Sequence, residues 1–151
     1  MKNFKNYYLL LISALFLFVL SAIVSKEIRY TLNIYDTYYV ISGADFYKCF
    51  AILTLTVGLI YLVLDKMEVA LKQFFVKVHV FATLVLIATL IFFTHKSNAT
   101  QTIIIGGDFS NPINYGFYAR INLILIIFLQ FFFLINIFAA QIKNLKNATV
   151  K

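Results

Sequence analysis

The sequence predicts an all-α polytopic membrane protein, a four-helix transmembrane bundle, and two observations support this prediction. The first is composition. Hydrophobic residues make up 62% of the 151 positions and charged residues 13%, against roughly 45–50% and about 25% in average soluble domains, and the mean hydropathy is +0.89. The second is that the apolar residues gather in four long runs nearly free of charge. A soluble fold could not cover so much apolar surface with so few charges.

The four runs predict helices over about residues 7–24, 46–64, 74–94 and 117–140. Crossing a bilayer takes roughly 17–25 apolar residues in a helix, so each run is long enough. Backbone polar groups in lipid must bond to one another, which favours helices over irregular chain. The connections are short, and we therefore expect one transmembrane domain over residues 1–151.

The first run and the last connection leave alternatives open. Lys2 and Lys5 before the first run resemble the basic start of a cleaved signal peptide, but the apolar run is long for one, and a retained helix is favoured. The longest connection, residues 95–115, contains the turn-forming pairs Gly106-Gly107 and Asn111-Pro112. Its isoleucine triplet at residues 103–105 is expected to dip into the membrane interface or to form a short strand.

The net charge of +7 predicts an orientation in the membrane and not a nucleic-acid partner. With both termini cytoplasmic, eight basic residues lie inside and five outside, as the positive-inside rule favours. Lysines at helix ends extend toward anionic headgroups. The chain is thus expected to be a multi-pass protein of the inner membrane, in contact with the lipid bilayer. The inside set is Lys2, Lys5, Lys66, Lys72, Lys77, Lys143, Lys146 and Lys151, and the outside set is Lys26, Arg29, Lys48, Lys96 and Arg120.

Few residues could bind a metal or a heme. His79 and His95 fall at the two ends of the third run, roughly 24 Å apart along a helix, so they cannot ligate the same iron. His79 is expected to bond a neighbouring helix, and His95 to cap or extend the outer end of its own helix. The single cysteine, Cys49, offers no internal disulfide and is expected to be a small buried residue.

Two acids flank the outer end of the second run. Ionisable groups at membrane depth are costly and often functional, so Asp36 and Asp45 are candidate polar sites. Ser42-Gly43-Ala44-Asp45 also fits a capping box, and a cap is the favoured interpretation of Asp45. For Asp36 the alternative is an ion pair with a nearby base.

Three amides interrupt the fourth run. Asn122 and Gln130 are expected to share one helix face, and Asn136 to be rotated away from it. Amides at this depth usually bond across helices. The sequence contains no P-loop, nucleophile triad, CxxC pair or pair of catalytic carboxylates.

An ordered series of segments resembles subunit I of the heme-copper oxidases, the cytochrome c and quinol oxidases. DTYYV, at residues 36–40, resembles the HDTYFVVAHFH motif, which in that family leads into a transmembrane helix from the outer face. LSAIVSKEIRYTLNIYDTYYV is similar to the end of the preceding helix and its outer loop. KVHVFATLVLIATLIFF and NLILIIFLQFFFLINIF resemble the next helix and the last one. The resemblance implies that the chain corresponds to the C-terminal four-helix portion of that subunit.

The positions that carry the family's chemistry hold other residues here. Tyr35 occupies the position of the histidine that precedes the aspartate in the family's motif. Gly43 occupies the position of the histidine that is the axial ligand of the oxygen-reducing heme. Asp45 occupies the position of a histidine ligand of the electron-transferring heme. Asp36 matches the aspartate beside the family's magnesium site. Glycine has no ligating side chain and a carboxylate is a poor substitute for imidazole, so the resemblance implies ancestry without oxidase activity, catalytic residues or bound heme.

The expected function is that of a non-catalytic integral membrane protein with a structural or interaction role. It would pack against other membrane subunits, or against itself, in a membrane assembly. Two alternatives stay open. One is a heme-binding redox membrane protein with a dimeric site that uses His79. The other is a small transporter or lipid-binding protein that uses Asp36, Asp45, Asn122 and Gln130.

Overall fold

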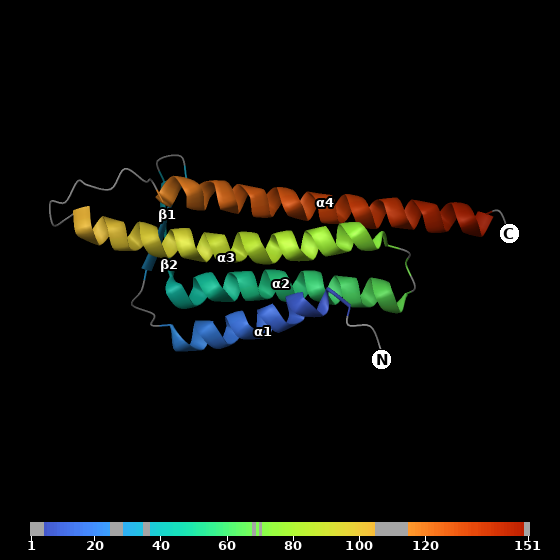
Figure 1. Ribbon diagram of the computed structural model, residues 1–151, viewed down its shortest axis with the longest axis horizontal. Helices are drawn as coiled ribbons and strands as arrows, with labels where there is room; N and C mark the ends of the chain where they lie inside the picture. The colour runs from blue at the N-terminus through green and yellow to red at the C-terminus, as the bar shows by residue number, and fades with distance from the viewer. Residues whose placement is uncertain are drawn as a thin grey trace.

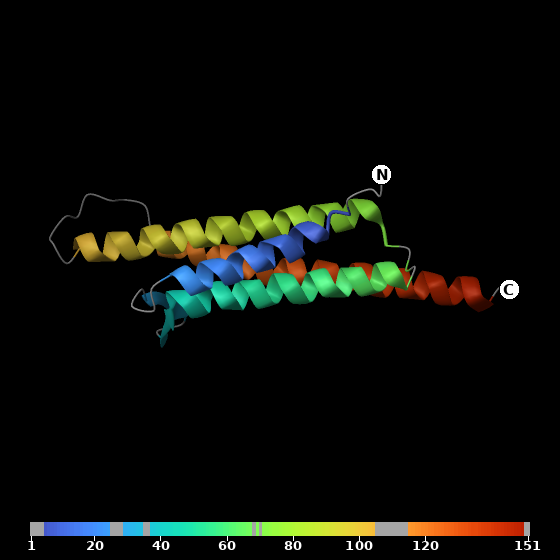
Figure 2. The ribbon, with the colours of Figure 1, turned by 90° about the horizontal axis from the view of Figure 1, so that it is seen from below.

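The computed structural model describes residues 5–24, 29–34, 37–67, 69, 71–104 and 115–149, and these form four helices and one β-hairpin. The helices are α1 (Tyr8–Ile23), α2 (Gly43–Lys66), α3 (Gln73–Ile104) and α4 (Tyr115–Thr149). They run side by side along one axis, as Figures 1 and 2 show. The predicted all-α class is confirmed.

The helices extend beyond the predicted ranges at several ends. α3 continues to Ile104, so the first part of the expected connection is helical, and His95 lies within the helix instead of at its end. The prediction was wrong because residues 95–104 contain no glycine or proline that would stop a helix. Ile103 and Ile104 are helical and form no strand. Ile105 and both turn-forming pairs lie outside the described residues.

Among the described residues, three helices are long and apolar enough to cross a membrane, namely α2, residues 73–97 of α3 and residues 115–142 of α4. α1 has 16 residues and is therefore about 24 Å long, against a hydrocarbon thickness of about 30 Å. The expectation of a full-length span is thus met by three helices and not by α1. The start of α1 and the end of α4 point toward the same end of the bundle, and α4 extends further (Figure 1).

The hairpin lies between α1 and α2, in a segment that was expected to be a loop. Strands β1 (Arg29–Ile34) and β2 (Thr37–Ser42) pair antiparallel, with Arg29 opposite Ser42 and Ile34 opposite Thr37. The segments RYTLNI and TYYVIS are rich in β-branched and aromatic residues, which explains the pairing. Tyr30 of β1 is buried, and its ring lies 4.9 Å from the ring of Phe46 in α2. The hairpin therefore packs against α2 near the start of that helix.

The bundle consists of two helix pairs, since α1 packs mainly on α2 and α3 mainly on α4. The buried residues of α1 form one stripe, made of Leu10, Ala14, Leu17 and Ser21. On the facing side, a Cβ added to Gly58 would lie 2.7 Å from Leu11 Cδ2. The absence of a side chain at Gly58 thus lets α1 approach α2 closely, as small residues do between membrane helices.

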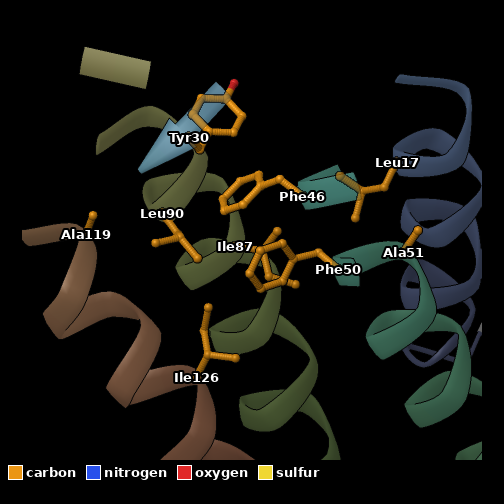
Figure 3. Packing of buried hydrophobic residues seen from close by; sticks show 9 residues of the cluster. All are labelled: Leu17, Tyr30, Phe46, Phe50, Ala51, Ile87, Leu90, Ala119 and Ile126. Carbon is orange, nitrogen blue, oxygen red and sulfur yellow. The ribbon is translucent and has the colours of Figure 1, made fainter. Parts of the chain in front are cut away.

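Large side chains fill the space between the two helix pairs. Near the hairpin, Phe46 and Phe50 of α2 point toward Ile87 and Leu90 of α3 (Figure 3). The same cluster includes Leu17, Tyr30, Ala51, Ala119 and Ile126. A second cluster lies toward the other end and is formed by Tyr7, Leu10, Val57, Tyr61, Val76, Val80 and Phe133. The candidate site lies in this second cluster.

Candidate functional site

A polar cluster of Tyr61, His79 and Gln130 lies where α2, α3 and α4 meet. Tyr61 is 1% exposed and His79 4% exposed. The Tyr61 hydroxyl and His79 Nδ1 are 3.1 Å apart and form a hydrogen bond. The Phe133 ring of α4 stacks on the imidazole at 5.0 Å and 16°. The prediction that His79 bonds a neighbouring helix is confirmed, and the bond joins the two helix pairs.

The far side of the imidazole faces Gln130. His79 Nε2 and Gln130 Oε1 are both buried without a hydrogen-bond partner among the described residues. The two side chains still interact electrostatically across the α3–α4 interface. With the proton on Nε2, Nδ1 accepts from the Tyr61 hydroxyl.

The amides of α4 mostly face α3. Asn122 is buried, and its Oδ1 accepts a hydrogen bond of 2.9 Å from Thr89 Oγ1 of α3. The expected bond across helices is therefore confirmed for Asn122. Gln130 Nε2 donates at 3.3 Å to the Ile126 carbonyl within its own helix. Residues on this face thus link α3 to α4, as polar groups between membrane helices do.

Asn136 is not rotated away from this face, contrary to the sequence prediction. It follows Asn122 by nearly four helical turns, at about 3.6 residues per turn, and so returns to almost the same side of α4. Its Nδ2 is buried without a hydrogen-bond partner among the described residues. Asn136 lines a cavity between α4 and the start of α3.

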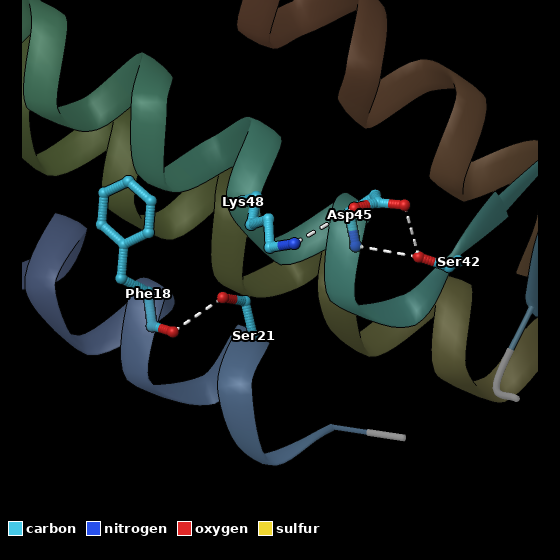
Figure 4. Close-up of polar contacts among 5 residues, drawn as sticks. All are labelled: Phe18, Ser21, Ser42, Asp45 and Lys48. Atoms are coloured by element: carbon cyan, nitrogen blue, oxygen red, sulfur yellow. Dashed lines mark hydrogen bonds and ion pairs between the residues drawn. The ribbon is translucent and has the colours of Figure 1, made fainter. Parts of the chain in front are cut away.

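Asp45 acts as part of the N-terminal cap of α2. Ser42 Oγ accepts a bond of 3.1 Å from the Asp45 backbone N–H and lies 2.7 Å from Asp45 Oδ2. Figure 4 shows both contacts and the exposed ion pair to Lys48, at 3.4 Å. The carboxylate therefore stabilises the first turn of α2. The predicted Ser42 cap is confirmed, and Asp45 itself is exposed.

The other residues that the sequence resemblance singled out are only partly described by the structure. Gly43 is the first residue of α2 and is buried. Tyr35 and Asp36 lie outside the described residues, as do the proposed ion pairs of Asp36. Within the described ranges, no three His, Cys, Asp or Glu side chains gather in a way that could hold a metal ion. Cys49 is exposed, which corrects the expectation of a buried thiol.

Two contacts were missed by the sequence reasoning. Tyr61 could have been suspected as a polar residue in an apolar run, but nothing in the sequence paired it with His79. The second contact joins the chain before α1 to the end of α2, where Lys5 Nζ forms an ion pair with Asp65 and the Tyr7 hydroxyl donates to Asp65 Oδ2 at 3.1 Å. Lys5 and Asp65 are both partly exposed, so their pairing contributes about 0–1 kcal/mol.

The fold and the site define a class, an all-α protein with three helices of membrane-spanning length and apolarity whose polar side chains link helices together. Comparison with protein-family models, with curated proteins and with solved structures found no match to this chain.

Proposed function

We propose that this chain is a non-catalytic, multi-pass protein of the inner membrane, descended from the C-terminal part of heme-copper oxidase subunit I. Its role is to pack against other membrane subunits in an assembly. The observation that carries the proposal is the apolar surface of α4. In the most apolar stretch of α4, only 17% is buried inside the protein, against 44% in the corresponding stretch of α2. Large side chains such as Phe128, Phe131 and Phe138 stand on its outer face.

The polar residues support a structural role. Asp45, which stands at a family heme-ligand position, is engaged by Ser42 at the start of α2. Asn122 bonds Thr89 across the α3–α4 interface. Asp45 and Asn122, two of the residues that a transporter would use, therefore have structural partners within the protein. A hydrogen bond between helices, such as that of Asn122, suits a scaffold that presents its outer face to neighbours.

The proposal predicts that α4 contacts another membrane protein through its outer face. A photo-crosslinking amino acid at Phe131, which is 58% exposed, is expected to yield adducts with a second protein in the native membrane. The matched control is the same probe at Phe133, two positions along the helix and 4% exposed, which should react only within the chain. Adducts from Phe131 and Phe128 that contain only lipid would contradict a packing role.

The heme alternative makes an opposite prediction that a spectrum can decide. Axial ligation needs an imidazole nitrogen open to the iron, whereas His79 is 4% exposed and lies between Tyr61 and Phe133. The purified protein is therefore expected to lack a Soret band at stoichiometric intensity, with or without added hemin. A reducible Soret band that disappears in His79→Leu, while the Thr89→Val control keeps it, would overturn the non-catalytic assignment.

A further inference from the structure

A cavity suited to a ligand lies between the start of α3 and the last turns of α4 inside its apolar span. Its volume is about 350 Å³, within the usual range of small-molecule sites, roughly 300–1,000 Å³. The walls are mostly apolar, with two polar side chains. The lining residues are Lys72, Phe75, Phe132, Ile135, Asn136, Ala139 and Ala140.

Both polar side chains that line the cavity carry hydrogen-bond donors. Asn136 Nδ2 is buried and has no acceptor within the described part of the chain. Lys72 Nζ lies 5.6 Å from the centre of the Phe75 ring, which holds the ammonium over the wall. The ion pairs that the structure describes, Lys5–Asp65 and Lys48–Asp45, use other lysines. A donor pair of this kind is complementary to a group that only accepts, such as a phosphodiester.

The depth of the two donors matches that of a lipid headgroup. Lys72 directly precedes α3, so it lies at the boundary of an apolar span that begins at Gln73. Asn136 lies about two turns, roughly 9 Å, inside the point where the apolar span of α4 ends at Ile142. In a bilayer, the ester carbonyls of a phospholipid lie just deeper than its phosphate. The small side chains of Ala139 and Ala140 leave the space beside them open to an acyl chain.

We infer that this cavity is a binding site for one anionic phospholipid. The Lys72 ammonium pairs with the phosphate, the Asn136 amide donates to an ester carbonyl, and an acyl chain lies against Phe75, Phe132 and Ile135. Charge complementarity selects the anionic lipid, because a lysine at the membrane surface favours anionic over zwitterionic headgroups. The inference rests on the membrane placement in the proposed function and is independent of the packing role of α4.

The test measures lipid binding by the full chain in detergent. Native mass spectrometry and thermal unfolding are recorded with phosphatidylglycerol and with phosphatidylcholine of the same acyl chains. Phosphatidylglycerol is expected to bind one to one and to raise the unfolding temperature more than phosphatidylcholine. Lys72→Gln should weaken this binding about fivefold. Lys66→Gln is the matched control, because Lys66 is exposed at the same end of the bundle but does not line the cavity.

Two further variants distinguish specific lipid binding in the cavity from nonspecific contact with surrounding lipid. Ala139→Phe fills the cavity and should abolish one-to-one binding, and Asn136→Leu should weaken it while leaving the helical circular dichroism unchanged. Equal effects of the two lipids, equal losses in Lys66→Gln and Lys72→Gln, or full binding by Ala139→Phe would each overturn the site. Failure of the α4 crosslinks would leave these outcomes unaffected, so the two proposals fail separately.

Discussion

Replacing Gly58 by leucine is expected to push α1 away from α2 and to lower the free energy of unfolding by about 1–3 kcal/mol. The reason is the close approach of the two helices, since even a Cβ at Gly58 would lie 2.7 Å from Leu11 Cδ2 and 3.4 Å from Leu10 Cβ. Leu10 is fully buried and cannot move aside. Chemical denaturation in detergent micelles measures the loss.

Two matched variants show whether the contact or the added bulk is responsible. Gly58→Ala is expected to be nearly neutral, because the end of the flexible Leu11 side chain can shift and helix propensity favours alanine by about 1 kcal/mol. Val63→Leu adds volume on the exposed side of the same helix and should change little. Wild-type stability of Gly58→Leu would mean that α1 does not pack on α2 at this point.

Removing the Tyr61 hydroxyl is expected to destabilise the bundle because it leaves His79 Nδ1 buried without a partner. Orphaning a buried polar atom costs about 1–3 kcal/mol. Bonds between membrane helices average about 0.6 kcal/mol, so the lower end of that range is expected for Tyr61→Phe. Tyr118→Phe, which removes a hydroxyl at a position that is 45% exposed, serves as the control and should be neutral.

A double-mutant cycle isolates the interaction energy between Tyr61 and His79. The double variant Tyr61→Phe, His79→Leu leaves no orphaned imidazole, so its loss of stability should be smaller than the sum of the two single losses. The cycle is measured by denaturation in the same detergent, with helicity followed by circular dichroism. Strict additivity of the two substitutions would show that the hydrogen bond between them contributes nothing to the fold.

Hydropathy predicted the helices well because it is a property of each segment. The apolar runs located all four helices, and the predicted start of α2 differs from the observed one by less than a turn. The cap at Ser42 was predictable for the same reason, since the bond to Asp45 spans only three residues. The end of α3 was missed because a helix continues until something stops it, and the nearest glycine lies at Gly106.

The hairpin shows a different kind of error. RYTLNI and TYYVIS contain the residues that strands favour, but two short strands are marginal on their own. What stabilises them is contact with the bundle. Tyr30 packs on Phe46, and burial together with the nearby Tyr47 hydroxyl raises the pKa of Tyr30 to about 12. The local sequence of the hairpin does not reveal this contact between Tyr30 and Phe46.

The all-α class and the approximate helices could be predicted from the sequence alone, since composition and run length are local properties. Tertiary packing brings Tyr61 to His79, places Asn136 and Lys72 in the wall of one cavity, and sets α1 against Gly58. Each of these contacts joins separate helices. Their pairing depends on how the helices pack and rotate against one another, which no single apolar run specifies.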